Sequence, residues 1–278
     1  MEYNLFGCLF FGLFSGLSEF LPVSTLAHQY LFDFLTGFSG NDAYIRMMVY
    51  LGCLIAVIVC CRGRLVHIYR ELRLASLPKR RRKRVPDLQA VSDFKLCMIA
   101  LIPMVIGVVF CRQSYGFFGN LPMICVTLII SGVLCYLPAL MVAGFGNSKN
   151  LTPMDGILLG VCSAVGVIPG ISRMGTLLYA EKARHCGREA ALELALLFAI
   201  PMMLVFTVFH LIDLLVGTGL VFSVHTLIAG IISAAAAFGG AVGSIFLMRY
   251  LVYMRGFSDF AYYNWGLSVF CFIFYLIT

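Results

Sequence analysis

Charged residues are scarce in this chain, where Asp, Glu, Lys and Arg together make up 12% of 278 residues. Soluble domains carry about 25% charged residues, and 61% of the residues here are hydrophobic. This composition excludes an ordinary soluble globular protein. Apolar segments of about 18 residues recur, whereas the alternating pattern of a membrane β-barrel is missing. The sequence therefore predicts an all-α polytopic membrane protein.

The sequence also lacks the cysteine spacing of a disulfide framework, a redox pair or a zinc site. Its 11 cysteines are scattered, and no Cys-x-x-Cys motif occurs. The simplest interpretation is that cysteine serves here as a small apolar side chain. No basic segment and no small-residue cleavage site accompany the first apolar segment, so we expect no removable signal peptide.

Basic residues are concentrated in one loop. The formal net charge is +7, and ten of the twenty Lys and Arg residues lie between Arg62 and Arg84. A basic segment beside a spanning helix is typical of a cytoplasmic loop that also touches anionic lipid head groups. We therefore expect membrane lipids, and no nucleic acid, as partners. With loop 62–93 in the cytoplasm, the N-terminus lies outside and nearly all basic residues lie inside.

Long apolar segments define the predicted fold. A spanning helix needs about 20 apolar residues, and two pairs of segments are shorter than this and are separated by a polar break. We predict six transmembrane helices and two re-entrant helix-break-helix hairpins. The predicted spans lie near 44–61, 94–111, 121–142, 190–212, 226–250 and 261–277, and the predicted hairpins at 4–36 and 154–180.

The order of these elements predicts an inverted repeat. Residues 1–142 and 152–278 each contain one hairpin followed by three spans, and together they form one membrane domain. Inverted repeats with broken helices near the midplane are typical of many transporters, in which helix N-termini face anionic groups. Glu181, Lys182, Arg184 and His185, after the second hairpin, are interpreted as a solvated turn.

The two hairpin breaks carry the polar side chains that point to function. The first break reads Glu19-Phe-Leu-Pro22-Val-Ser24-Thr25-Leu-Ala-His28, and the second reads Pro169-Gly170-Ile-Ser172-Arg173-Met-Gly175-Thr176. A charged group at the bilayer centre costs about 2.5 to 3.5 kcal/mol, so such residues are functional candidates. Helices restarting near Ser24 and Ser172 would direct two positive helix ends at an anion. We expect the two breaks to meet at one site that binds a phosphate or diphosphate.

These residue types suit phosphoryl transfer. Arg173 offers a bidentate fork to an anion, and Ser172, Gly170 and Thr176 are the remaining candidates for binding the diphosphate. Glu19, His28 and the hydroxyls of Ser24 and Thr25 supply acid, base and nucleophile candidates. Two alternatives stay open: the hydroxyls cap the restarted helices, and Glu19 with Arg173 forms a purely structural buried ion pair.

At these residues the sequence resembles the undecaprenyl-diphosphatase family, membrane enzymes linked to bacitracin resistance. The family motif E-G-L-T-E-F-L-P-V-S-S-x-G-H is similar to residues 15–28, and P-G-x-S-R-S-G-A-T is similar to residues 169–177. The resemblance implies an enzyme of the cell membrane of bacteria that removes the terminal phosphate of undecaprenyl diphosphate. By the same resemblance, the reaction regenerates the lipid carrier for peptidoglycan and cell-wall synthesis, and the site faces the periplasm or exterior.

Three departures from the family motifs concern cofactor and activity. The resemblance implies help from Mg2+ or Ca2+, with Glu19 as a metal ligand, but the family's earlier glutamate is Ser15 here. That change removes half of a carboxylate pair suited to a divalent cation. Met174 replaces a serine, and the final threonine falls at Leu177, next to Thr176.

The residues leave the roles and one rival function open. His28 is a nucleophile or a general acid, Glu19 a base or a metal ligand, and Ser24 or Thr25 an orienting or attacking hydroxyl. The rival is a transporter or flippase that moves a polyprenyl phosphate through the same architecture without hydrolysis. A homodimer is a further open prediction.

Overall fold

The protein is built from helices along the part of the chain that the structure describes. The computed structural model describes residues 3–38, 42–82, 84–118, 120–141, 151–217, 223–254 and 257–277. The helices in these residues are α1 (Leu5–Glu19), α2 (Thr25–Thr36), α3 (Ala43–Cys60), α4 (Arg62–Ser76), η1 (Lys79–Arg81), α5 (Leu88–Phe118), α6 (Leu121–Leu140), α7 (Pro153–Val165), α8 (Arg173–Ala183), α9 (Arg188–Val216), α10 (Val224–Met254) and α11 (Asp259–Ile277).

Six of these helices are long and apolar enough to cross a membrane: α3, α5, α6, α9, α10 and α11. This confirms the six predicted spans. Large apolar side chains stay exposed along them, among them Ile102, Ile231 and Phe272, as expected of helices that face lipid. The span in α5 begins at Leu88, earlier than predicted, because its polar first turns continue the helix.

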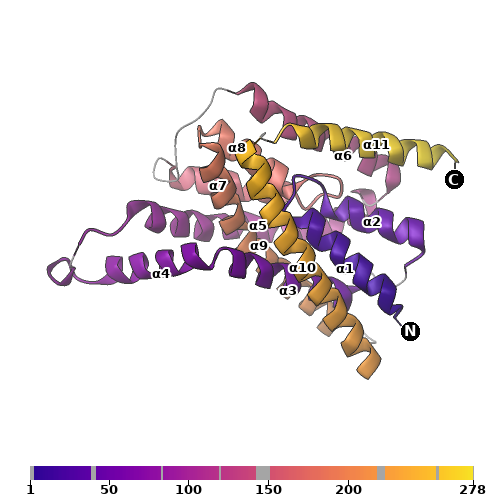
Figure 1. The fold of residues 1–278 in the computed structure, drawn as a ribbon, viewed down its shortest axis with the longest axis horizontal. Helices are drawn as coiled ribbons and strands as arrows, with labels where there is room; N and C mark the ends of the chain where they lie inside the picture. The colour runs from indigo at the N-terminus through magenta and orange to yellow at the C-terminus, as the bar shows by residue number, and fades with distance from the viewer. Residues whose placement is uncertain are drawn as a thin grey trace.

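The two predicted hairpins have the expected helix-break-helix form. α1 and α7 have 15 and 13 residues, and each is followed by a short break and a second short helix. α1 packs along α10, and α7 packs along α5 (Figure 1). At Gly16 a Cβ atom would lie 2.2 Å from the carbonyl oxygen of Ala237, so glycine is what permits the close approach of α1 to α10. The re-entrant course of the hairpins stays a prediction.

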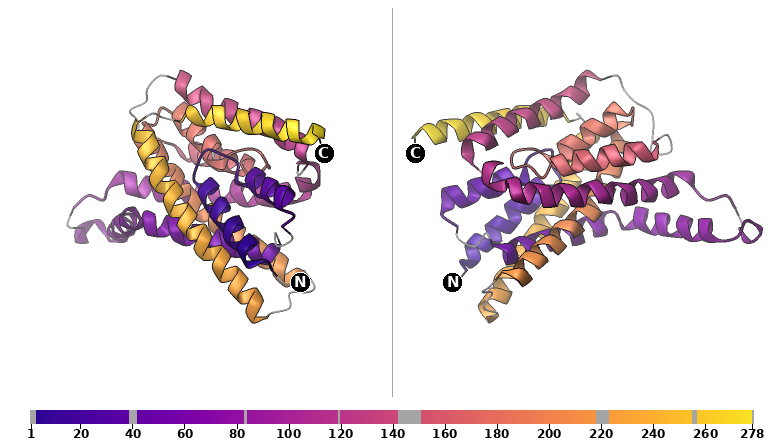
Figure 2. Two further views of the ribbon diagram at one scale, coloured as in Figure 1. Left: turned by 45° about the vertical axis from the view of Figure 1, so that its right-hand side comes forward. Right: turned by 180° about the vertical axis from the view of Figure 1, so that it is seen from behind.

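The two predicted halves of the chain interlock. α1 from the first half packs on α10 from the second, and α7 from the second packs on α5 from the first. α3 also contacts α9, and α6 lies side by side with α11 (Figure 2). The α3–α9 and α6–α11 pairs join equivalent helices of the two predicted halves, and the α1–α10 pair is the counterpart of the α7–α5 pair. The inverted repeat itself and its limits stay predictions. Residues 142–150, at the boundary between the two predicted halves, lie outside the described residues.

The basic loop contains more helix than the sequence indicated. α4 and the first turns of α5 occupy most of 62–93 and extend away from the other helices in Figure 1. The buried Glu71 accepts hydrogen bonds from Arg84 Nη1 at 3.0 Å and from the backbone N–H of Asp87 at 2.9 Å. The hydrogen bond from Arg84 holds the pKa of Glu71 below its ordinary value. These contacts fold the loop back onto α4.

The predicted solvated turn after the second hairpin is wrong in part. α8 continues through Ala183, and it buries Glu181 completely and leaves Lys182 6% exposed. Arg184 is half-exposed and pairs with Asp155 at 2.6 Å. Glu181 and Lys182 therefore belong to a packed helix end, because α8 contacts α6, α7 and α9, whereas Arg184 and His185 follow the helix and are exposed.

Candidate active site

The first break ends α1 at Glu19 and starts α2 at Thr25. Ser24 is the N-cap residue of α2, and its hydroxyl accepts a hydrogen bond from the backbone N–H of Ala27 at 3.3 Å. The carbonyl oxygen of Pro22 accepts from Asn264 Nδ2 at 3.0 Å. The predicted helix restart near Ser24 is confirmed, and a side chain of α11 satisfies the open backbone of the break.

The second break has the same design on a different set of helices. Ser172 is the N-cap residue of α8, and its hydroxyl accepts from the backbone N–H of Gly175 at 3.1 Å. Thr127 of α6 donates to the carbonyl oxygen of Pro169 at 2.7 Å. Gly170 has φ 91°, and a Cβ atom there would lie 1.8 Å from the Thr127 hydroxyl. Only glycine suits this turn, because both its backbone conformation and the space around it exclude a side chain.

The two breaks meet, as the sequence predicted. The backbone N–H of Gly170 donates to the Ser24 hydroxyl at 2.9 Å, although the two residues lie in different hairpins. Both α2 and α8 therefore begin close to one another. Their first turns place free backbone N–H groups and two partial positive charges near the same point.

A buried ion pair lies at this meeting point. Arg173 donates through Nη2 to Glu19 Oε1, and the residues are 8% and 5% exposed. The guanidinium also stacks on aromatic rings, with its Cζ 4.6 Å from the ring centroid of Phe206 and 5.9 Å from that of Tyr50. Thr25, the first residue of α2, is 5% exposed, and its hydroxyl lies within electrostatic reach of the Glu19 carboxylate.

The ion pair leaves hydrogen-bonding capacity unused. Glu19 Oε2 and Arg173 Nη1 are both buried and have no hydrogen-bond partner. A purely structural ion pair would be expected to satisfy these atoms, since an unpaired buried polar atom costs about 1 to 3 kcal/mol. One free donor and one free acceptor at the junction of two helix N-termini are suited to an anionic ligand that also carries a proton.

Thr176 and His28, two further predicted residues, make different contacts. The Thr176 hydroxyl donates to the carbonyl oxygen of Arg173 at 2.9 Å, so it supports the first turn of α8. His28 contacts the Ser24 carbonyl oxygen through Nδ1 and the Tyr263 hydroxyl through Nε2, both at 2.7 Å. With a proton on Nδ1, the neutral imidazole accepts at Nε2 from Tyr263. Within the described part of the chain, no hydrogen bond or ion pair joins His28 to Glu19 or Arg173.

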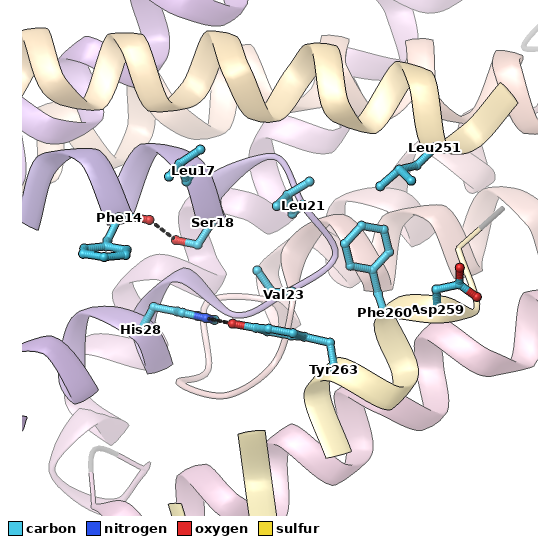
Figure 3. A pocket seen from close by; sticks show the side chains of 10 residues that line it. All are labelled: Phe14, Leu17, Ser18, Leu21, Val23, His28, Leu251, Asp259, Phe260 and Tyr263. Atoms are coloured by element: carbon cyan, nitrogen blue, oxygen red, sulfur yellow. Dashed lines mark hydrogen bonds between the residues drawn. The ribbon is translucent and has the colours of Figure 1, made fainter. Parts of the chain in front are cut away.

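An apolar pocket of about 370 Å³ lies beside His28. Figure 3 shows His28 and Tyr263 along one side of it, with side chains of α1 and of the end of α10 opposite. Leu17, Leu21 and Leu251 are among its apolar lining residues. The polar meeting point and an apolar pocket are thus both reached from the first break, which is an arrangement suited to an amphiphilic ligand.

The residues at the ion pair do not form a cluster that would hold a divalent cation. Among the described residues, no group of three or more His, Cys, Asp or Glu side chains is placed for metal binding. Ser15 lies one helical turn before Glu19 and accepts a hydrogen bond from the amide of Gln29 at 3.0 Å. Glu19 itself pairs with Arg173. The predicted help from Mg2+ or Ca2+ therefore stays untested, with one carboxylate where a pair would suit the metal.

Sequence reasoning missed the neutral residues around the ion pair. Phe206 and Tyr50 lie in apolar spans, where nothing distinguishes an aromatic residue that packs from one that stacks on a guanidinium. Gln29 and Asn264 carried a usable signal, since a buried amide in an apolar helix needs a partner. Gln29 also follows Thr25 by four residues, which places it on the same helix face.

Residues 8–270 match the profile of the family described as "Bacitracin resistance protein BacA". The chain belongs to this family. A relative named "Undecaprenyl-diphosphatase" from Syntrophotalea carbinolica is 30% identical over 91% of this chain and 92% of its own length. Relatives of the same name from Alkaliphilus metalliredigens and Methanobrevibacter smithii are 27% and 28% identical, and cover 98% and 97% of the chain and 99% and 97% of their own lengths. The family indicated by the two motifs is confirmed.

Proposed function

We propose that this BacA-family protein is an undecaprenyl-diphosphate phosphatase, which releases inorganic phosphate and regenerates the monophosphate lipid carrier. The observation that carries the proposal is the buried pair of Glu19 and Arg173, with its unpartnered atoms at the junction of two helix N-termini. The names of the relatives supply the substrate. They give the transporter alternative no support.

The site offers separate places for the two parts of such a lipid. The diphosphate would bind at Arg173 Nη1 and the first turns of α2 and α8, where donors and helix dipoles favour anions. The polyprenyl chain would enter the apolar pocket beside His28. Arg173 offsets the negative charge that develops on the transferring phosphoryl group, and the surrounding apolar helices exclude bulk water, which strengthens this interaction.

The geometry favours Thr25 over Ser24 as the attacking hydroxyl. The oxygen of Ser24 already accepts hydrogen bonds from Gly170 and Ala27, whereas the Thr25 hydroxyl is buried within electrostatic reach of Glu19. In this proposal Thr25 attacks the terminal phosphorus and gives its proton to Glu19, and the lipid monophosphate leaves. Water then cleaves the phosphothreonine bond and releases phosphate, which restores the hydroxyl.

His28 acts at the boundary between the two parts of the site. In its neutral form, with Nδ1 bound to the Ser24 carbonyl, it cannot donate a proton through Nε2, which accepts from Tyr263. A general-acid role therefore requires protonation of the imidazole and release of Tyr263. We propose that its part in this resting arrangement is to hold the first turn of α2 beside the pocket.

Membrane orientation follows from the distribution of basic residues. We propose that the N-terminus lies outside and that the 62–93 segment is cytoplasmic, as the positive-inside rule favours. Under this proposal the protein is a multi-pass enzyme of the bacterial cell membrane whose site faces the exterior. An assembly of two copies stays a prediction.

Trapping of a phosphorylated protein tests the assignment of the nucleophile. Undecaprenyl diphosphate labelled in its terminal phosphate would be mixed briefly with purified protein and quenched in acid. We expect label on the wild type and on Ser24→Ala, and none on Thr25→Val, which keeps the side-chain shape without the hydroxyl. Label on Thr25→Val, or full turnover by that variant, would contradict the assignment.

A further inference from the structure

A second polar pair joins α1 and α2, one helical turn away from Glu19 and Thr25. Gln29 Nε2 donates to Ser15 Oγ at 3.0 Å, and the residues are 3% and 1% exposed. Ser15 precedes Glu19 by four residues and Gln29 follows Thr25 by four, so each shares a helix face with one of them. The two short helices therefore present two consecutive polar pairs, one charged and one neutral.

The neutral pair, like the charged one, contains a buried polar atom without a hydrogen-bond partner. Gln29 Oε1 is buried and has no hydrogen-bond partner. It shares this state with Glu19 Oε2 and Arg173 Nη1, the unpartnered atoms of the neighbouring charged pair. A buried acceptor without a donor is costly, so the free oxygen of Gln29 would gain from a ligand that brings a hydrogen-bond donor to it.

Charge balance indicates what the neutral pair does. The negative charge of Glu19 is matched by Arg173, so the site is close to neutral before a ligand binds. The family motif has a glutamate where this chain has Ser15, and a second carboxylate beside a diphosphate would call for a divalent cation to offset the repulsion. An uncharged amide adds no such repulsion, and its free oxygen accepts a hydrogen bond from an O–H group.

We propose that Ser15 and Gln29 form a neutral diphosphate subsite that replaces a carboxylate and its metal ion. Gln29 Oε1 accepts a hydrogen bond from the protonated terminal phosphate, Arg173 binds the anionic oxygens, and Ser15 positions the amide. This inference rests on the proposed function. It adds that the chain binds and hydrolyses its substrate without a divalent cation beside Ser15 and Gln29.

Two substitutions of Gln29 test the subsite with different readouts. For Gln29→Leu we expect the KM for a polyprenyl diphosphate to rise about tenfold with a smaller change in kcat, as for loss of one hydrogen bond. For Gln29→Glu, which is nearly isosteric, we expect little turnover in chelator and at least about tenfold recovery with Mg2+. Wild-type turnover should be the same in chelator and in Mg2+.

Binding measurements separate this inference from the phosphatase itself. Calorimetry with a non-hydrolysable methylene-bisphosphonate analogue of farnesyl diphosphate should show binding by the wild type in chelator, and weaker binding by Gln29→Leu. Gln29→Glu should bind the analogue well only with Mg2+. A wild type that binds the analogue in this way but releases no phosphate would overturn the proposed function and leave the subsite standing.

A matched pair of serine variants tests whether the hydrogen bond between Ser15 and Gln29 is merely structural. Ser15→Ala removes the hydroxyl that positions the amide. Ser233→Ala is its matched control, because Ser233 of α10 is buried and its hydroxyl donates to the backbone carbonyls of Cys8 and Ala229. We expect Ser15→Ala to weaken analogue binding and Ser233→Ala to leave it unchanged. Equal analogue affinity in wild type and a folded Gln29→Leu, or a wild type that binds only with Mg2+, would overturn the subsite.

Discussion

The ion pair between Glu19 and Arg173 allows stability and turnover to be separated. Removing one partner of a buried pair leaves the other charge uncompensated and costs about 3 to 5 kcal/mol. Both side chains here are less than 10% exposed, so the full range applies. We expect Arg173→Met and Glu19→Gln each to lower the free energy of unfolding by about 3 to 5 kcal/mol and to lose phosphate release.

The double variant Arg173→Met/Glu19→Gln removes both charges at similar volume. Replacing a buried pair by uncharged residues is often neutral or stabilising by about 1 to 4 kcal/mol, so the double variant should be more stable than either single one. It should still release no phosphate, since the anion donor and the proton acceptor are both gone.

Unfolding in detergent can be followed by the fluorescence of Trp265. This residue is the single tryptophan of the chain, and its indole N–H donates to the carbonyl oxygen of Ile129 across α6 and α11 at 3.2 Å. Stability losses that simply add in the double variant would refute direct pairing of Glu19 with Arg173. Normal turnover by the double variant would refute the site.

Three further predictions concern the pocket, the second break and the basic loop. Leu251→Trp should fill the apolar pocket and raise KM about tenfold for a long-chain polyprenyl diphosphate, with no effect for a short-chain one in the same phosphate-release assay. Gly170→Ala should lower the free energy of unfolding by denaturant by about 2 to 5 kcal/mol, because it strains the backbone and clashes with α6. Gly37 has φ 63° but lies in open space, so Gly37→Ala should lower the free energy of unfolding by about 1 to 2 kcal/mol and keep turnover. The hydrogen bond from Arg84 lowers the pKa of Glu71 in the folded state. The ionised Glu71 therefore stabilises the fold fully above its unfolded-state pKa of about 4.3, and this stabilisation is lost as the pH falls through the lower pKa of the folded state. Glu71→Gln should make unfolding less sensitive to acid, and an unchanged pH profile would contradict this.

The spanning helices could be predicted from the sequence because the bilayer fixes their length and composition. Apolar segments such as 121–142 match α6 closely, since water and lipid alone decide where they end. The start of α5 and the course of α4 were missed. Both depend on tertiary contacts of polar residues, including the ion pair of Arg64 with Asp93 at 2.7 Å, which hydropathy does not record.

The charged half of the candidate site could also be predicted. Glu19 and Arg173 stand out because a charge inside an apolar segment needs a partner, and serine before a restarted helix indicates an N-cap. Gln29 carries a weaker signal, because an amide in an apolar helix needs a partner but has many structural uses. Its importance emerges only from its contact with Ser15 and its unpartnered oxygen.

The most direct test of the account is phosphate release from undecaprenyl diphosphate by the purified wild type and by Arg173→Lys, each in chelator and in Mg2+. Lysine keeps the charge but not the two-pronged donor, so it cannot both hold Glu19 and reach the phosphate. The account predicts release by the wild type in both conditions and little release by Arg173→Lys. No release by a folded wild type, or equal release by both proteins, would contradict it.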